Sequence, residues 1–246
     1  MCRQYALDLG WDDVAARYGV AGDGMKDNDL PPVPCRRFEP RHPIGIVARS
    51  RDGRNRLAAA HWSLVPRWSR DFDLPYPTYN ARSESAASKP TFADSVRSMR
   101  AVVPATGYFE FKGDRPFYFH APDGSPLAMA GLYSWWRDPS ATPSTAPSSP
   151  WRLTATILTC PALDAFAKVH DRMPLLVPPD MVAAWLDHAQ DGRSLLSRLR
   201  AAGPELSRSL AFHEVAPAVP GVGDADLTTP LNGAGRRPEA EQPALF

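Results

Sequence analysis

The alternation of apolar and polar residues along this chain predicts many short strands and fewer helices. Strands are indicated where apolar residues alternate or run together between turn-forming residues. We expect strands at residues 5–9, 42–48, 56–63, 100–104, 108–111, 116–120, 126–133, 152–159 and 175–177. Helices are expected at residues 12–18, with Asp12 as a candidate N-cap, and at 91–99, 161–169, 178–188 and 191–201. Residues 21–34 and 138–150 are rich in loop-forming residues.

The size and composition of the chain are those of a globular protein. It has 246 residues, of which 43% are hydrophobic, enough to bury one substantial core in one domain or two small ones. No apolar run approaches the length of a membrane span, and the first ten residues lack a signal-peptide pattern. We therefore expect a soluble, cytoplasmic protein with no membrane partner.

Positive charge is concentrated in one part of the chain, although the formal net charge is only +1. Residues 36–100 hold twelve Arg and one Lys against six acidic residues, a local charge of +7. A guanidinium binds phosphate in a bidentate fork, so this cluster favours a polyanionic partner. The ratio of 24 Arg to 4 Lys over the whole chain is also what a GC-rich genome produces, so the clustering is the stronger indication.

The second residue is a cysteine with distinctive chemistry. Removal of Met1 would give Cys2 both a free α-amine, with a pKa of about 7.7–8.0, and a thiol. Such a pair traps an aldehyde, because the amine forms a Schiff base and the sulfur then closes a thiazolidine ring. The alternative is that Cys2 follows the initiator methionine by chance and has no chemical role. Cys35 and Cys160 add no metal-ligand spacing, and we expect no metal or other cofactor.

Two segments carry residues suited to nucleic acid. Trp62 and Trp68 flank Pro66, and such aromatic side chains either stack on bases or fill the core. Asn80 and Arg82 would share one face of an extended segment with Glu84. An amide beside a guanidinium suits a sugar and its phosphate, although a solvated strand face would have the same pattern.

Two further residues are acid–base candidates. Glu110 lies within the aromatic strand 108–111, and burial there would raise its pKa toward neutrality. Alternation alone does not decide which face Glu110 occupies. His170 follows a predicted helix and precedes Asp171 and Arg172, a charged setting more typical of a site than of a structural histidine.

Together these motifs resemble the SOS-response-associated peptidase (SRAP) family. The resemblance is carried by Met1-Cys2 and by residues 62–68, 80–84, 104–110, 130–133 and 170–174, in the family's order. It covers about residues 1–218 and implies a single α+β domain, in which mostly antiparallel strands curl into a barrel-like sheet with peripheral helices. Residues 219–246 would form a flexible C-terminal tail.

The resemblance also implies an activity. Family members crosslink to abasic sites in DNA, so Cys2 would form a thiazolidine with an abasic site in single-stranded DNA, and the protein would act as a monomer. The catalytic residues would be Cys2, Asn80, Glu110 and His170, and the DNA contacts Arg3, Trp62, Pro66, Trp68, Arg82 and Arg172. The family usually has glycine and arginine after the cysteine, where this chain has Arg3 and Gln4.

Two other functions remain open at this stage. Cys2 would be the nucleophile of a cysteine peptidase or amidohydrolase, with its own amine as the base. Alternatively the chain is a single-strand-binding module in which Cys2 is inert.

The last five residues of the sequence suggest a further partner. Gln242, Leu245 and Phe246 resemble the short Gln-x-x-Leu-Phe peptides by which bacterial repair proteins dock on the replicative sliding clamp. The aliphatic–aromatic pair would fill a pocket and Gln242 would bond to its rim, with residues 224–241 as a leash. A chance match, or folding of the pair onto the domain, are the alternatives.

Overall fold

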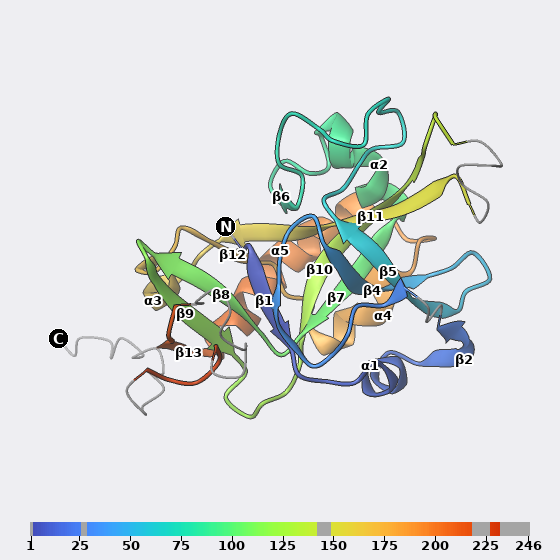
Figure 1. Cartoon of the computed structure of the whole chain (residues 1–246). Coiled ribbons are helices and arrows are strands. Elements are labelled where there is room, and N and C mark those ends of the chain that lie inside the picture. Colours follow the sequence, from blue (N-terminus) through green and yellow to red (C-terminus); the bar gives the residue numbers. More distant parts are fainter. Residues whose placement is uncertain (1, 26–28, 142–148, 218–226, 232–246) are drawn as a thin grey trace.

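The computed structural model describes residues 2–25, 29–141, 149–217 and 227–231 (Figure 1). Strands dominate the described part of the chain. They are β1 (Gln4–Leu7), β2 (Val20–Met25), β3 (Cys35–Phe38), β4 (Pro43–Arg49), β5 (Asn55–Trp62), β6 (Asn80–Arg82), β7 (Arg100–Ala105), β8 (Gly107–Lys112), β9 (Arg115–His120), β10 (Leu127–Arg137), β11 (Trp151–Pro161), β12 (Arg172–Pro174) and β13 (Ala211–Glu214). The helices are α1 (Trp11–Arg17), α2 (Pro90–Ser98), α3 (Asp164–Ala167), the 3-10 helix η2 (Pro179–Met181), α4 (Val182–Leu186) and α5 (Gly192–Arg208).

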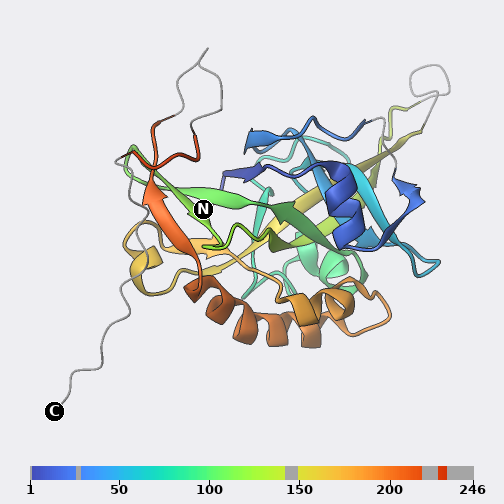
Figure 2. The same cartoon turned by 90° about the horizontal axis from the view of Figure 1, so that it is seen from below.

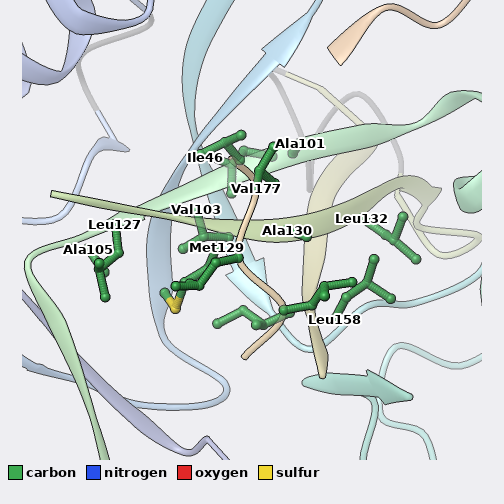
Figure 3. Close-up of a cluster of buried hydrophobic side chains, with 14 of the residues drawn as sticks. Ile46, Ala101, Val103, Ala105, Leu127, Met129, Ala130, Leu132, Leu158 and Val177 are labelled. Atoms are coloured by element: carbon green, nitrogen blue, oxygen red, sulfur yellow. The ribbon is translucent and has the colours of Figure 1, made fainter. Parts of the chain in front are cut away.

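Five strands close into a barrel. Antiparallel pairing runs through β11, β10, β7, β4 and β5, and a parallel pairing of β11 with β5 at Thr154↔His61 completes the ring. Closure removes the free edges that an open sheet would have. Side chains such as Val103, Met129 and Leu158 pack together in its core (Figure 3).

A second sheet of five strands, in the order β13-β9-β8-β1-β3, lies against the barrel. Tyr5 of β1 joins the two sheets, because its ring stacks on Phe38 at 4.6 Å and meets Trp62 of β5 edge-on at 5.4 Å. The opposite face of this sheet buries Phe109 and Tyr118 in a separate small cluster. One face of this sheet therefore packs on the barrel core, and the other packs in the small cluster that contains Phe109 and Tyr118.

The long helix α5 runs along one side of the sheets, at the bottom of Figure 2. Arg100, at the start of β7, is buried and joins helices α2 and α4. Its guanidinium donates to backbone carbonyls of Val96 and Arg97 at the end of α2, and of Trp185 and Asp187 at the end of α4. These carbonyls are among those that a helix terminus leaves without an intrahelical partner, and the cation also suits the negative end of each helix dipole.

The predicted fold is confirmed: the structure is a mixed α+β arrangement dominated by strands, with a five-stranded barrel and peripheral helices. Several local expectations were wrong. The expected loop at 21–34 contains most of β2, which gains parallel pairing with β5. Gly10, not Asp12, occupies the N-cap position of α1. Residues 175–177 form only an isolated bridge, Met129↔Leu176, and α5 extends seven residues past the predicted end at 201.

The predicted boundary between domain and tail stays a prediction, because residues 218–226 and 232–246 lie outside the described part of the chain. Within the expected tail, residues 227–231 lie against β13. The Leu231 N–H donates to the Glu214 carbonyl at 2.9 Å, and Pro230 forms a bridge with Val215.

The contacts of Arg100 generate a prediction about stability. Replacing Arg100 with Met should lower the free energy of unfolding by roughly 3–5 kcal/mol, since several buried carbonyls lose their donor. Arg100→Lys should recover only part of this loss, because one ammonium cannot reach both helix ends. Urea denaturation measures the effect. The control is Arg97→Met, whose side chain is exposed and pairs with Asp94, and it should change stability by less than about 0.5 kcal/mol. Equal stability of Arg100→Met and the wild type would contradict this role.

Candidate functional site

The N-terminal segment is held beside β8 by strand pairing. In the antiparallel pair of β1 with β8, Gln4 lies opposite Phe109 and Tyr5 opposite Tyr108. Cys2, just before β1, is fully buried. The pairing therefore delivers the N-terminal cysteine to the part of β8 that holds Glu110.

Glu110 lies on the buried face of its strand, which settles the alternative that the sequence left open. Successive residues of a strand point to opposite faces. Phe109 packs in the outer cluster, so Glu110 shares the barrel-facing side with Tyr108, whose ring packs in the main core. Only 2% of Glu110 is exposed, and this burial raises its pKa to about 7, against the opposing positive charges of the amino terminus and Arg3.

The Cys2 sulfur is a thiol rather than a thiolate in this environment. Burial, followed by the charge of Glu110, raises the pKa of Cys2 well above its usual value. The thiol makes a long contact of 3.7 Å with the Gln4 carbonyl. A base must therefore accept its proton before the sulfur can attack, and Glu110 is the carboxylate whose charge acts on it.

Asn80 fixes the backbone of Cys2. It begins β6, which pairs in parallel with β11 so that Asn80 lies beside Ile157. Its Nδ2 donates to the Cys2 carbonyl at 2.7 Å. Its Oδ1 is buried and accepts no hydrogen bond from the described residues, so it is an acceptor for a ligand hydroxyl or amine.

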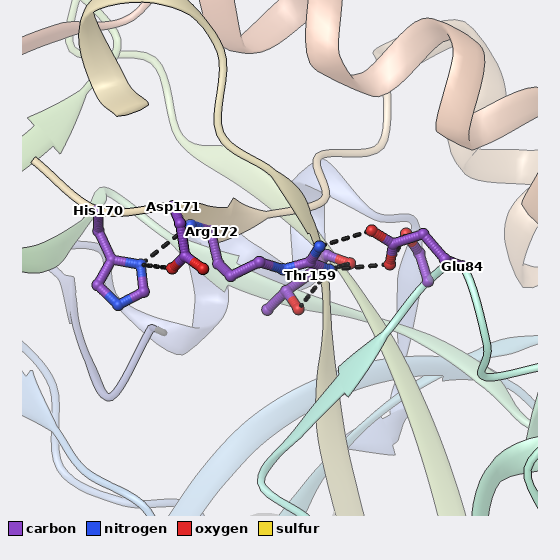
Figure 4. A network of polar contacts seen from close by, with 6 residues as sticks. Glu84, Thr159, His170, Asp171 and Arg172 are labelled. Carbon is purple, nitrogen blue, oxygen red and sulfur yellow. Dashed lines mark hydrogen bonds and ion pairs between the residues drawn. The ribbon is translucent and has the colours of Figure 1, made fainter. Parts of the chain in front are cut away.

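His170 is held in one orientation by its neighbours (Figure 4). Its Nδ1 accepts the Arg172 backbone N–H at 3.0 Å and lies 2.9 Å from an Asp171 carboxylate oxygen. Burial lowers the pKa of His170, as does the positive charge of Arg3, although Asp171 opposes them. The backbone N–H of Arg172 favours a neutral ring that accepts at Nδ1, whereas the Asp171 carboxylate favours the imidazolium, and in both states Nε2 carries a proton. The charge of Arg3 acts on both His170 and Glu110, so the two groups border the same N-terminal site.

Three predicted DNA contacts lie on the surface. Arg3 and Arg82 are exposed, and Trp68 is 57% exposed. These side chains are accessible to a ligand in the described structure. The side-chain amide of Gln4, by contrast, is already engaged within the protein, because its Nε2 donates to Glu39 at 2.8 Å.

The other three predicted DNA contacts are not accessible, and these assignments are corrected. Trp62 is fully buried and its Nε1 donates to the Tyr79 carbonyl at 2.8 Å, so its ring fills the core. Pro66 is buried too. Arg172 is buried in a bidentate ion pair with Glu84 at 2.5 and 2.9 Å, which also lowers the pKa of Glu84 to about 2. A guanidinium engaged in this way positions β12 rather than binding phosphate.

Sequence reasoning missed the ion pair of Glu84 with Arg172 and the position of Tyr108 on the same strand face as Glu110. Glu84 lies in the turn after β6, and 88 residues separate it from Arg172, so no local pattern indicates the pair. Tyr108 stands two residues before Glu110, and strand alternation would have placed the two side chains on one face. Its pKa is raised well above 10 by burial and then by Glu110 and Cys2.

Two classes of feature are absent from the described part of the chain. No helix there is long and apolar enough to cross a membrane. Over the same residues, no group of three or more His, Cys, Asp or Glu side chains is arranged to hold a metal ion.

Comparisons with known proteins extend over most of the chain. Curated relatives include the abasic site processing protein YoqW of Bacillus subtilis strain 168, 27% identical over 197 residues, which are 76% of this chain and 80% of that protein. The abasic site processing protein YedK of Escherichia coli strain K12 is 29% identical over 238 residues, 94% of this chain and 100% of its own.

Solved structures share the fold. A protein from Bacteroides thetaiotaomicron matches with a TM-score of 0.72 at 22% identity, covering 92% of this chain and 97% of its own. A phage-related protein from Bordetella bronchiseptica matches with a TM-score of 0.64 at 25% identity, covering 92% of this chain and 100% of its own. The family model described as SOS response associated peptidase (SRAP) matches residues 1–222, and the chain therefore belongs to the SRAP family.

Proposed function

We propose that this protein processes abasic sites in DNA by binding single-stranded DNA and linking the abasic sugar covalently to Cys2. The observation that carries the proposal is the buried Cys2, with its carbonyl held by Asn80 and its thiol under the influence of Glu110. The names of the curated relatives, abasic site processing proteins, support the same substrate.

The substrate is positioned before the chemistry begins. Arg82 and Arg3 are exposed guanidiniums that would bind phosphates flanking the abasic site, and Trp68 offers an exposed ring for stacking on a neighbouring base. The Nε2–H of His170 would hydrogen-bond to the sugar ring oxygen, which takes a proton from water while the C1′ hydroxyl gives one up to water, so that the ring opens to the C1′ aldehyde.

The covalent steps use Glu110 first as an acid and then as a base. After loss of Met1, the neutral Cys2 amine adds to C1′ and forms a carbinolamine. The Glu110 carboxylic acid protonates its hydroxyl, water leaves, and an iminium and a carboxylate remain. The carboxylate then accepts the thiol proton while the sulfur attacks C1′, which closes the thiazolidine and restores the carboxylic acid. A carboxyl with a pKa of about 7 serves both steps near neutral pH.

This order of steps distinguishes the proposal from its two rivals. A peptidase or amidohydrolase needs the sulfur to attack first as a thiolate, and the raised pKa of Cys2 disfavours that start. A simple binding module has no use for a protonatable carboxyl beside the thiol.

The covalent product is the most direct test of the proposed function. We expect the intact mass of the protein lacking Met1 to rise, on incubation with an abasic oligonucleotide, by the mass of that oligonucleotide minus one water. The same oligonucleotide with an intact base is the control and should give no adduct. A heat-stable adduct that persists undiminished in Cys2→Ala would refute the assignment of Cys2, and peptide turnover without DNA would favour the peptidase.

The roles of the amine and of Glu110 set the pH dependence of the reaction. The amine becomes neutral as the pH rises through about 7.7–8.0, whereas Glu110 loses its proton above about 7. The crosslinking rate should therefore be bell-shaped, with its maximum between these values and a fall on the alkaline side. Glu110→Gln should slow the reaction by roughly 100-fold and remove the alkaline fall, leaving a rate that rises to a plateau. An alkaline fall that survives in Glu110→Gln would mean that another group supplies the proton.

Docking on the replicative sliding clamp through Gln242, Leu245 and Phe246 is a separate part of the proposal. These residues lie outside the described part of the chain, and the motif alone supports it. A peptide of residues 239–246 should bind a bacterial clamp with micromolar affinity, and replacement of both Leu245 and Phe246 with Ala should abolish binding. Binding that survives this double replacement would exclude the motif as the anchor.

A further inference from the structure

A cleft opens between the hairpins β4–β5 and β10–β11, beside the start of β7. β7 begins at Arg100, which lies opposite Leu132 of β10, and its next residue lies opposite Ala48 of β4. Both neighbouring strands continue past this point, β10 as far as Arg137. The space beyond the start of β7 is a cleft of about 410 Å³, within the range of about 300–1,000 Å³ typical of small-ligand pockets.

The lining of the cleft is apolar and aromatic. Each hairpin contributes a cross-strand pair to its lining: Ile46 with Ala58 on β4–β5, and Trp135 with Leu153 on β10–β11. The two side chains of such a pair lie on the same face of the sheet. Tyr133 also lines the cleft and is half-buried. Trp135 is 42% exposed, so its ring is accessible for stacking.

The two hairpins that bound the cleft carry a net positive charge, and two of their arginines, Arg49 and Arg56, line the cleft. The two hairpins carry six arginines and two aspartates, a local charge of +4: Arg49, Arg51, Arg54, Arg56, Arg137 and Arg152 against Asp52 and Asp138. The aspartates pair with Arg56 at 2.8 Å and Arg152 at 3.0 Å. Arg49 lines the cleft, and its Nε donates to Asn55 Oδ1 at 3.3 Å. Arg49 also lines the neighbouring cavity beside Tyr18 and Asn55. Its terminal nitrogens form no hydrogen bond with the described residues, so they are available to an anion.

We propose that this cleft is a second nucleic-acid-binding site, which takes one unstacked nucleotide of single-stranded DNA. The base lies against Trp135 and Tyr133, and its phosphate is bound by Arg49. Aromatic side chains beside arginines are the means by which proteins hold single strands without reading sequence. Leu153, which lines the cleft, lies four residues before Ile157 on β11, and Ile157 is the neighbour of Asn80. Four residues span roughly 13 Å of strand. The cleft is therefore separate from the Cys2 site and needs none of its chemistry.

Photocrosslinking locates the bound base directly. The full-length chain carrying Cys2→Ala is irradiated with an oligothymidylate that contains 5-iodo-2′-deoxyuridine, and the modified peptide is mapped by mass spectrometry. We expect an adduct on Trp135 or Tyr133. Adducts confined to Trp68 and its surroundings would overturn the proposal. Free thymidine monophosphate should compete poorly at equal nucleotide concentration, and equally effective competition would assign the cleft to free nucleotides instead of a strand.

Matched variants test the same site by affinity. Trp135→Ala should weaken binding of undamaged oligothymidylate roughly tenfold, and Arg49→Gln should reduce the slope of log K against log salt by about one. Trp151→Ala is the control, because Trp151 is 41% exposed on the same strand pair but does not line the cleft. Equal losses from both tryptophan variants would contradict a specific cleft. With Cys2 intact and saturating DNA, Trp135→Ala should still form the abasic adduct, so failure at the cleft is distinguishable from failure of the proposed function.

Discussion

The burial of the Glu110 carboxyl beside Cys2 is the constraint around which this site is built. Removing a carboxylate from water favours its protonated form, and here the pKa rises to about 7. The same environment raises the pKa of the Cys2 thiol, with Glu110 adding to the effect of burial. Glu110 thus helps to keep the Cys2 thiol protonated at rest, and in the proposed ring closure the thiol proton passes to Glu110.

The fold produces this arrangement through strand pairing more than through local sequence. β1 is an inner strand of its sheet, between β8 and β3, so pairing on both sides holds the segment that follows Cys2. Asn80 reaches Cys2 from β6, which is attached to the barrel through β11. The site therefore lies where the second sheet meets the barrel, and the barrel's closed pairing gives it a rigid base. A rigid support of this kind limits the reorganisation needed when the abasic sugar enters.

Sequence patterns predicted most strands, whereas the grouping of the catalytic candidates came from the family resemblance. The failures have physical causes. The period-two signal shows that residues 108–111 form a strand, but only packing of Phe109 in the outer cluster assigns Glu110 to the other face. Trp62 and Trp68 look alike in the sequence, yet Trp62 ends a barrel strand and faces the core. Arg172 was expected to contact DNA from the family resemblance, and its carboxylate partner is too remote in the chain for a local pattern to indicate the ion pair. β2 was missed because a Gly-Asp-Gly segment has low strand propensity, which tertiary pairing with β5 overrides.

The protonation state of Glu110 is the central claim, and carbon-detected NMR of the side-chain carboxyl measures it directly. The protein lacking Met1 is produced with ¹³C-labelled glutamate residues and its spectrum is followed as the pH is changed. The Glu110→Gln variant identifies the Glu110 resonance, because that resonance disappears from its spectrum. A midpoint near pH 7, as burial requires, would support a carboxyl that donates a proton to the leaving water and then accepts one from the Cys2 thiol. A midpoint near the ordinary value of about 4.3 would contradict it, since Glu110 would then be ionised throughout the working range and could not act as the acid.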